Sequence, residues 1–312
     1  MTNPILLTES RFRYLDPDLI IDSPDFKIVE SFLKSTKRTE VGWHYIIDLA
    51  WIYSIIKDWP RSYKIIDAGG GVGPTQFMLA ELGFHVTNID LVMSSPSQYL
   101  VQRYGTQLTR LKSYEPSDYV QHLEGRVDIH TLTRNLRNLI KNTYLWERLS
   151  SYSYNWRHDA WRANQGAKPL GKIDWIQGNL CHMPEIKDAS FDAVVSLSSL
   201  EHIPLDLLPN ALNELERVLK PQSLMAITTS ATDAEETWFH EPSKGACFSS
   251  KGLAKLFNAQ DISKQSATEI LKKYQKSSYL RDNLGASYYA SGNNGMPWGK
   301  WNPRYIPVGI WR

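Results

Sequence analysis

Cysteine is scarce in this chain, whose 312 residues include only Cys181 and Cys247. Two thiols so far apart, neither in a Cys-x-x-Cys pattern, argue against a disulfide scaffold and against a cysteine zinc site. The first residues lack the basic start and long apolar region of a secretory signal, and no apolar run is long enough to cross a bilayer. We therefore expect a cytoplasmic protein with free thiols and no membrane partner.

An excess of one charge is also missing, because 35 Lys and Arg residues are balanced by 33 Asp and Glu residues, a net charge of +2. This balance gives no general attraction to nucleic acid or to an anionic membrane. Hydrophobic residues make up 42% of the chain and charged residues 22%. That composition is typical of a globular protein with a sizeable core.

Glycine is concentrated in one informative stretch, residues 64–73, which read K-I-I-D-A-G-G-G-V-G. The apolar residues predict the end of a buried strand, Asp67 ends the run, and residues 75–82 have helical composition. A strand, a glycine turn and a helix let backbone N–H groups and a helix N-terminus approach a bound ligand. A second predicted strand, 84–89, ends at Asp90, where a carboxylate is well placed to accept hydrogen bonds from ribose hydroxyls.

The spacing of these glycines excludes two common nucleotide sites. A dinucleotide fingerprint, G-x-G-x-x-G/A, would put Pro74 or Gln76 where a small residue is needed. A phosphate-binding P-loop is excluded because no Gly-Lys-Ser/Thr follows. The pattern present is D-x-G-x-G-x-G, and a glycine-rich turn without a ligand is the alternative for this stretch taken alone.

Further motifs follow along the chain. They are N-I-D-L at 88–91, Q-G-N-L at 177–180, S-F-D-A-V-V-S at 190–196, L-E-H-I at 200–203 and E-L-E-R-V-L-K-P at 214–221. With the glycine stretch, and in this order, they resemble the class I S-adenosylmethionine (SAM)-dependent methyltransferases, in particular the small-molecule type. The resemblance covers 64–92 and 173–258, is weak over 1–60 and is absent over 100–170.

The resemblance implies that the first motifs hold SAM, which becomes S-adenosylhomocysteine (SAH) in the reaction. Gly69, Gly71 and Gly73 would let the backbone approach the amino-acid tail and the ribose. Asp67 would organise this turn through its carboxylate, and Asp90 would accept hydrogen bonds from both ribose hydroxyls.

The resemblance also assigns residues to the adenine and methyl ends of the site. Leu91 and Leu180 would lie beside adenine, and Asn179 would bind adenine N1 or N6. The family usually has Asp at the position of Asn179, and Asn keeps an acceptor while adding a donor. Ser196 and Leu197, at the end of the family's fourth strand, would line the methyl-transfer channel.

Two histidines are the candidate general bases, because the transfer needs an aligned nucleophile and the removal of any proton it carries. His202 follows the fourth strand, and His240 lies in the loop after the fifth. Imidazole titrates near neutral pH, but each residue has a structural alternative: a hydrogen-bonding role for His202 and a solvated loop position for His240. We predict no metal, since Asp67 and Asp90 are explained by the cofactor and no carboxylate cluster is left.

The order of strands and helices predicts an α/β fold. With the resemblance it implies a Rossmann-like, seven-stranded, mostly parallel sheet with helices on both faces, forming a SAM-binding domain over 64–312. Residues 1–63 would form an N-terminal helical extension, whose helix over 43–56 would cover the sheet edge. The segment 304–311 resembles the family's antiparallel seventh strand, and Pro307 places it at an edge or a bulge.

A long insert follows the family's second strand, because about eighty residues separate Asp90 from Ile173 where a simple crossover needs a few tens. We predict a helical lid over about 95–171, rich in Tyr, Trp and Arg, that shapes the acceptor pocket. Nucleic-acid stacking and an oligomer interface are the alternatives. The insert and the N-terminal helix are the candidate surfaces for a homodimer, and the glycine-rich loop 291–299 would close over the site or form a surface turn.

Together these inferences predict a methyltransferase that moves a methyl group from SAM to an oxygen or nitrogen atom of a small-molecule acceptor by in-line displacement. Two other functions stay open at this point. One is methyl transfer to RNA or to a protein or peptide side chain, and the other is a SAM-binding scaffold without catalysis.

Overall fold

A nine-stranded sheet runs through the computed structural model, which describes residues 9–36, 41–115, 155–166, 169–283, 295–296 and 300–312. The strand order is β10-β1-β11-β7-β6-β2-β3-β5-β4. The strands of this sheet are β1 (Ser10–Tyr14), β2 (Lys64–Ala68), β3 (His85–Asp90), β4 (Thr109–Arg110), β5 (Lys172–Gln177), β6 (Phe191–Leu197), β7 (Leu219–Ala231), β10 (Ala259–Asp261) and β11 (Ile306–Trp311). A separate antiparallel pair consists of β8 (Trp238–His240) and β9 (Gly245–Cys247).

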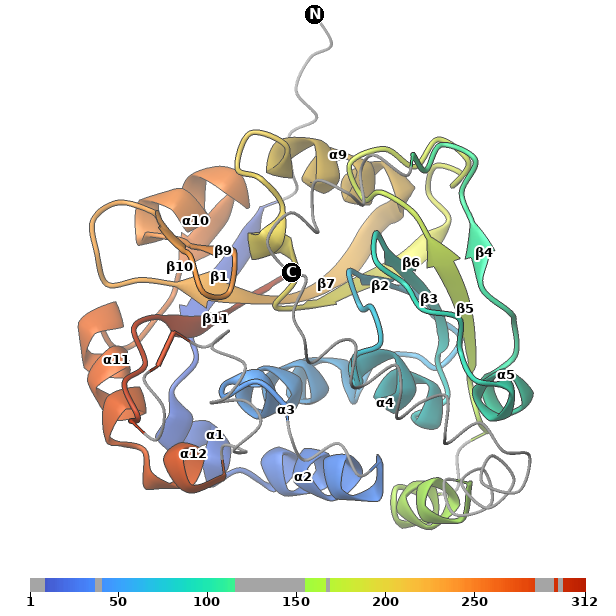
Figure 1. Cartoon of the computed structure of the whole chain (residues 1–312), viewed down its shortest axis with the longest axis horizontal. Helices are drawn as coiled ribbons and strands as arrows, with labels where there is room; N and C mark the ends of the chain where they lie inside the picture. Colours follow the sequence, from blue (N-terminus) through green and yellow to red (C-terminus); the bar gives the residue numbers. More distant parts are fainter. Residues whose placement is uncertain (1–8, 37–40, 116–154, 167–168, 284–294, 297–299) are drawn as a thin grey trace, which may run out of the picture.

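Helices cover both faces of the sheet, as Figure 1 shows. They are α1 (Pro17–Ile21), α2 (Pro24–Thr36), α3 (Tyr45–Ile56), α4 (Thr75–Glu81), α5 (Gln98–Tyr104), α9 (Leu208–Val218), α10 (Ser250–Leu256), α11 (Ala267–Lys276) and α12 (Ser278–Asn283), with a 3-10 turn, η1 (Leu200–His202). Helices α3 and α4 lie on one face and α9 and α10 on the other. The predicted α/β, Rossmann-like fold is confirmed.

The centre of the sheet is parallel and the strand order explains how distant segments meet. Strands β7, β6, β2, β3 and β5 are parallel neighbours, and β11 joins β7 in the antiparallel sense, as predicted for the last strand. The described residues give this sheet nine strands rather than the predicted seven. The short strands β10 and β4 form the two opposite edges, where β10 pairs with β1 and β4 with β5.

Strand β1 comes from the N-terminal region, which the sequence analysis described as helical only. It pairs with β11 in the antiparallel sense and with β10 in the parallel sense. Its side chains alternate between buried and exposed along S-R-F-R-Y, with Phe12 fully buried. This alternation is the pattern of a strand with one buried face. The alternating pattern of residues 10–14 therefore favours a strand, which the prediction of a purely helical extension missed.

Strand β11 is not at an edge, which corrects the prediction drawn from Pro307. It is paired on both sides, with β7 and β1. Pro307 lies where β1 ends: its carbonyl oxygen accepts a hydrogen bond from the Leu15 N–H at 3.0 Å. Pro307 has no N–H and so cannot donate a hydrogen bond back to the Leu15 carbonyl oxygen. The Tyr274 hydroxyl donates to that oxygen instead, at 2.8 Å.

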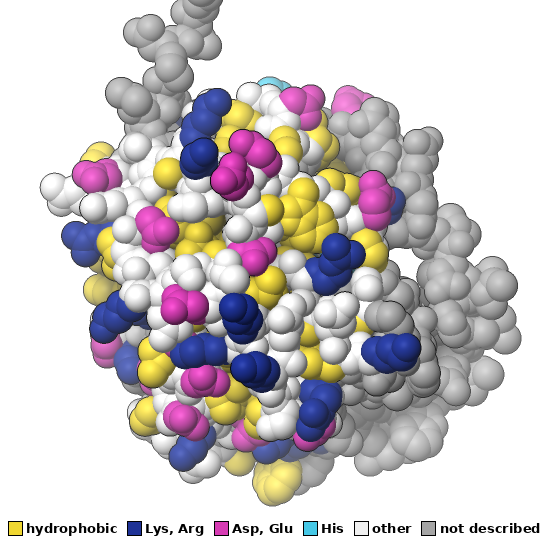
Figure 2. All heavy atoms as spheres, turned by 90° about the vertical axis from the view of Figure 1, so that its left-hand side faces the viewer, with side chains coloured by type: hydrophobic (Ala, Val, Ile, Leu, Met, Phe, Trp, Pro, Cys, Tyr) yellow, Lys and Arg dark blue, Asp and Glu magenta, His cyan; other side chains and the backbone are white. Residues whose placement is uncertain are grey.

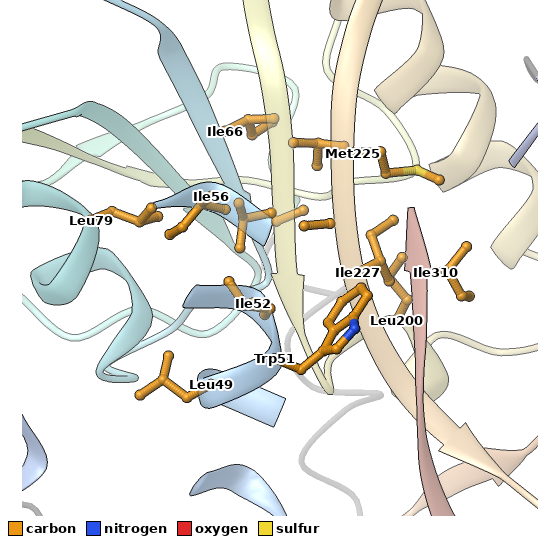
Figure 3. Close-up of a cluster of buried hydrophobic side chains, with 14 of the residues drawn as sticks. Leu49, Trp51, Ile52, Ile56, Ile66, Leu79, Leu200, Met225, Ile227 and Ile310 are labelled. Carbon is orange, nitrogen blue, oxygen red and sulfur yellow. The ribbon is translucent and has the colours of Figure 1, made fainter. Parts of the chain in front are cut away.

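Helix α3 packs across the face of the sheet, against β6, β7 and β11, rather than over its edge as predicted. Its other side packs on α2, so the helix is apolar on nearly all sides, as expected of a buried helix. Trp51 of α3 is 1% exposed and lies beside Ile227, Leu200 and Ile310 in the core (Figure 3).

Close packing of Trp51 depends on Gly309, and we expect Gly309→Ala to unfold the protein more easily. A Cβ atom at Gly309 would lie 2.4 Å from Cε2 of Trp51, a backbone-to-ring distance that requires a shift of α3 or β11. Overpacking of this kind costs about 1–3 kcal/mol, measurable as a lower urea midpoint. In a Trp51→Phe background the same change should cost clearly less, whereas equal costs in both backgrounds would contradict the assigned contact.

The predicted insert over about 95–171 is described only in part. It contains α5, β4 and a helix at residues 155–164, and residues 116–154 and 167–168 lie outside the described residues. The 155–164 helix packs on the N-terminal region: the Trp161 and Phe32 rings are 5.0 Å apart, and Arg157 donates to the Ser35 carbonyl oxygen. The glycine-rich loop 291–299 is outside the described residues except for Gly295 and Met296.

Charged residues of both signs are intermixed on the face over α10 and α11, the left-hand side of Figure 1 (Figure 2). Helix α11 alone carries Glu269 together with Lys273 and Lys276. The described part of this face therefore has no continuous basic surface of the kind that binds nucleic acid. None of the described helices combines the length and apolar composition needed to span a membrane.

Candidate functional site

The predicted cofactor residues meet at one edge of the sheet, because neighbouring parallel strands bring their carboxyl ends together. The Gly69 N–H, just after β2, donates to the Ile89 carbonyl oxygen of β3 at 2.8 Å. The Gly178 N–H, just after β5, donates to the Asp90 carbonyl oxygen at 3.0 Å. Residues distant in the chain, Gly178 and Asp90 among them, are thus joined by backbone hydrogen bonds around one loop.

The glycine loop has a conformation and surroundings that exclude side chains. Gly69 and Gly71 have φ angles of +73° and +48°, in the left-handed region that favours glycine. A Cβ atom at Gly70 would lie 2.3 Å from Oδ2 of Asp67, and one at Gly71 would lie 3.3 Å from Oδ2 of Asp90. The backbone of the loop therefore passes directly over both carboxyl groups.

Two amide side chains that the sequence analysis did not assign hold the loop in place. Asn88 Nδ2 and Gln76 Nε2 donate to the Gly71 carbonyl oxygen at 2.9 and 3.0 Å. Gln76 is fixed in turn by Trp175, whose Nε1 donates to its Oε1 at 2.6 Å. Gln76 occupies the position where a dinucleotide fingerprint needs a small residue. The same side chain that excludes that fingerprint therefore holds the loop through its bond to Gly71.

Asp67 is buried beneath the loop with 0% of its surface exposed. Neither carboxyl oxygen has a hydrogen-bond partner in the described structure, and the same is true of Oδ1 of Asn88. Burial, and secondarily the charge of Asp90, raises the pKa of Asp67 to about 8. Asp67 is therefore mostly protonated at neutral pH.

Asp90 lies half-buried at the end of β3, above the loop. Burial raises its pKa to about 6, while the backbone N–H groups of Val92 and Gly71 act in the opposite direction. The Val92 N–H donates to Oδ1 at 2.7 Å. At neutral pH Asp90 is an ionised acceptor at the mouth of the site, which suits the predicted bonds to two hydroxyl groups.

The predicted adenine residues lie on the loops after β3 and β5. Leu91 is half-buried, and Leu180 lies against the loop, 3.9 Å from the position of a Cβ atom at Gly69. Asn179 accepts a hydrogen bond from the Cys181 N–H through its Oδ1 at 2.9 Å. The Asn179 oxygen therefore organises its own turn.

Ser196, predicted to line the methyl-transfer channel, lies beneath the glycine loop. It is fully buried, and its hydroxyl donates to the Ala68 carbonyl oxygen at 2.8 Å. Ser199, which the sequence analysis did not assign, donates to the same oxygen at 2.8 Å. These bonds join the end of β6 to the base of the glycine loop, so Ser196 supports the loop from below. Leu197 is half-buried and packs against the core.

His202 lies beside the site and is oriented by a backbone group. Its Nδ1 is 2.9 Å from the Lys244 carbonyl oxygen, an acceptor that fixes the proton on Nδ1 and leaves the lone pair on Nε2. The charge of His202 also acts on Asp90, lowering its pKa. The structural hydrogen bond considered for His202 is therefore present, and it gives the ring the tautomer that a general base requires.

His240 is not a solvated loop residue, because it is 4% exposed and packs against Tyr305 and Trp238 with ring centroids 5.0 and 5.7 Å away. Its Nδ1 lies 2.7 Å from the Ser243 hydroxyl oxygen. Burial, with a smaller effect of the charge on Arg304, lowers the pKa of His240 to about 4. It is thus a weak base at neutral pH, and the geometry favours His202 of the two predicted histidines.

The described residues contain no group of three His, Cys, Asp or Glu side chains that could hold a metal ion. Cys247 is buried, which raises its pKa above the usual range. Both cysteines are free thiols. The chemistry of this edge therefore rests on carboxyl, amide, hydroxyl and imidazole groups.

A family model with the description "Methyltransferase domain" matches residues 149–227. Over these residues, about a quarter of its length, the chain is similar to a methyltransferase domain. The resemblance to the class I SAM-dependent methyltransferases is confirmed, and with it SAM as the predicted cofactor. The matched residues include β5 and β6. The glycine loop at 69–73 lies outside the matched range, but β2 and β3 lie between β6 and β5 in the sheet, because β2 pairs with β6 and β3 with β5.

Two solved structures are similar to this chain in fold. The 1,6-didemethyltoxoflavin-N1-methyltransferase of Burkholderia thailandensis, solved with 1,6-didemethyltoxoflavin and S-adenosylhomocysteine bound, is 14% identical over 97% of this chain and 99% of its own, with a TM-score of 0.41. The YcgJ protein of Bacillus subtilis is 11% identical over 85% of this chain and 96% of its own, with a TM-score of 0.39. No curated protein matches the sequence.

Proposed function

We propose that this protein transfers the methyl group of SAM to an oxygen or nitrogen atom of a small-molecule acceptor. The observation that carries the proposal is the glycine loop itself, with unpartnered, buried Asp67 below it and Asp90 at its mouth. The similarity to a methyltransferase domain supports the reaction class. The acceptor class is supported by the chain's own composition and surface.

The residues present fit SAM on three counts. Gly69 and Gly71 leave the loop bare where a side chain would contact Ser199 or Asp90. Asp90 offers carboxylate oxygens for two hydroxyl donors, and such charge-assisted hydrogen bonds are short and strong. Leu91 and Leu180 provide apolar surface on both sides of the adenine position predicted from the sequence. When bound, SAM supplies a methyl group activated by a sulfonium.

The chain's own residues would then align the acceptor, exclude water and accept a proton. Holding two reactants in an in-line arrangement contributes a large part of the rate of such a transfer. His202 presents Nε2 beside the site, with its Nδ1 proton fixed by Lys244. A neutral imidazole with one fixed nitrogen is an effective proton acceptor near pH 7.

A small-molecule acceptor is favoured over RNA by the charge of the chain. A net charge of +2 and the mixed charges over α10 and α11 (Figure 2) give little of the counterion release that RNA binding depends on. The residues about 95–171, which we propose to form a lid, are rich in Tyr, Trp and Arg. Aromatic side chains of this kind suit an organic acceptor in a concave site.

The test is to follow the label from methyl-tritiated SAM. We expect the protein to move label into the small-molecule fraction of a deproteinised cell extract, and to leave RNA and protein fractions unlabelled. Asp90→Ala serves as the control for label that does not depend on the site. Salt-sensitive labelling of RNA, or labelling of protein, would contradict the proposal and favour a methyltransferase that acts on macromolecules. SAM binding without transfer of label to any fraction would favour a SAM-binding scaffold without catalysis.

A further inference from the structure

The hairpin formed by β8 and β9 carries the backbone group that orients His202. His240 and Gly245 are the last paired residues of its two strands, and residues 241–244 form the turn between them. The Lys244 carbonyl oxygen in this turn is the partner of His202 Nδ1, at 2.9 Å. The orientation of the His202 ring therefore depends on the shape of a turn that lies 42 residues further along the chain.

His202 is also connected with the glycine loop through its own backbone. Its N–H donates to the Ser199 carbonyl oxygen at 3.1 Å. The Ser199 hydroxyl bonds to Ala68, and a Cβ atom at Gly69 would lie 2.2 Å from that hydroxyl oxygen. The His202 ring is half-buried at this edge of the sheet, and its charge acts on Asp90. His202 thus contacts both the segment that supports the glycine loop and the turn of the hairpin.

The turn has a conformation that needs support from its surroundings. Lys244 has a φ angle of +55°, in the left-handed region that residues other than glycine rarely adopt. Such a conformation persists only where neighbouring contacts hold it. The Lys244 side chain pairs with Glu241 at 2.8 Å, but both residues are exposed, and exposed ion pairs contribute little. The stronger constraint on the turn is therefore expected on its buried side, where His240 lies.

His240 supplies the buried contacts of this turn. The Ser243 N–H donates to Nδ1 of His240 at 3.3 Å, and the Ser243 hydroxyl oxygen lies 2.7 Å from the same nitrogen. Because a backbone N–H can only donate, Nδ1 is the acceptor and the ring proton is on Nε2. Burial lowers the pKa of His240 to about 4, so the ring is neutral and Nδ1 keeps its lone pair at neutral pH. His240 therefore fixes the residue that immediately precedes Lys244.

Close packing extends from His240 across the hairpin to His202. On the far side of His240, a Cβ atom at Gly295 would lie 2.5 Å from Nε2 of the ring. On the opposite strand, a Cβ atom at Gly245 would lie 3.2 Å from Cε1 and Nδ1 of His202 and from Cγ of Glu201. The last pair of the hairpin therefore contacts the His202 ring through Gly245, while His240 holds the turn beside it.

We propose that His240 is a positioning residue for the methyl transfer, because it holds the turn whose Lys244 carbonyl group orients His202; this rests on the proposed function. As the acceptor's lone pair bonds to the methyl carbon, the carbon–sulfur electron pair goes to sulfur and the acceptor's proton goes to Nε2 of His202, which later releases it to solvent. His240 takes no proton in this step. A loosened turn lets the His202 ring rotate, which lowers the fraction of molecules in the reactive arrangement.

The test compares two substitutions of His240, with methyl-tritiated SAM and the deproteinised small-molecule extract as probe. Leucine removes the acceptor of the Ser243 N–H, whereas asparagine can place its Oδ1 near the position of Nδ1 and keep that acceptor. We expect His240→Leu to lower the initial rate about tenfold or more, and His240→Asn to stay within about threefold of the wild type. SAH affinity measured by calorimetry should change less than about threefold in both. His85→Leu, at the opposite end of β3 from Asp90, is the control and should transfer at the wild-type rate.

A double-mutant cycle separates positioning of His202 from a general loss of structure. His202→Asn alone should lower the rate about 100-fold, and adding His240→Leu should then cost less than about twofold more, because no imidazole is left to position. If His240→Leu does not fold, Ser243→Ala serves as the second variant in the same two backgrounds.

Four results would overturn the inference: rate losses that multiply in the cycle, a His202→Asn or His240→Leu protein that transfers at the wild-type rate, a His240→Asn protein as slow as His240→Leu, or a loss of SAH affinity that accounts for the slower transfer. A wild-type protein that transfers no label would instead overturn the proposed function.

Discussion

Asp90→Asn should bind SAH about 30–100-fold more weakly than the wild-type protein at pH 7.5. The carboxylate of Asp90 is ionised at this pH and lies at the mouth of the glycine loop. Losing the charge from two hydrogen bonds to hydroxyl groups costs about 2.0–2.7 kcal/mol, which corresponds to this change in Kd. Isothermal titration calorimetry with SAH measures it directly.

A matched control for Asp90→Asn lies at the opposite end of the strands. Asp192, near the start of β6, accepts from the Lys64 N–H and pairs with Lys220. Asp192→Asn should leave SAH affinity unchanged. The wild-type protein should also lose affinity as the pH falls below about 6, where Asp90 becomes protonated, and Asp90→Asn should lack this dependence. Equal affinity of Asp90→Asn and wild type would exclude Asp90 from the site.

Asp67→Asn should stabilise the ligand-free protein at pH 7.5, by an amount on the order of 4 kcal/mol. Folding at this pH forces Asp67 to take up a proton that the unfolded chain does not hold, because its pKa rises from 3.8 to about 8. Each unit of such a shift corresponds to about 1.4 kcal/mol. Asn has the same shape and needs no proton. The measurement is the free energy of unfolding in urea.

The pH dependence of stability gives the sign of this effect. Because the folded state binds the proton of Asp67 more tightly than the unfolded state, its contribution is fully present below about pH 4 and is lost as the pH rises to about 8. The wild-type protein should therefore lose stability over this range, and Asp67→Asn should lose much less. The surface variant Asp192→Asn should not gain stability at pH 7.5. A destabilised Asp67→Asn protein would contradict this expectation, because it would show that the carboxyl group makes a stabilising interaction that an amide cannot make.

Much of the site could be predicted from the sequence, since its residues follow short, strongly patterned strands. The apolar runs before Asp67 and Asp90 identify β2 and β3, and parallel pairing then brings their carboxyl ends together. The glycine spacing fixes the loop because only glycine adopts the φ angles of Gly69 and Gly71 without strain. Local pattern and tertiary arrangement agree here, which is why these elements were found.

Other features depend on partners that are distant in the chain. Pro307 indicated an edge strand, but a hydroxyl group from Tyr274 replaces the missing N–H and lets β11 lie inside the sheet. Ser196 is buried against Ala68, a contact that appears only when β6 pairs with β2. His202 and Lys244 are distant in the chain, and only the turn of the β8–β9 hairpin brings them together. No pattern within one segment contains these contacts.

The central claim is that the glycine loop after β2 holds the methyl donor, and a crystal structure of the protein grown with SAH tests it most directly. The account predicts SAH lying on residues 69–73, with its ribose hydroxyls within hydrogen-bonding distance of the Asp90 carboxylate and its adenine between Leu91 and Leu180. SAH bound elsewhere, or a loop that stays empty at saturating SAH, would contradict it.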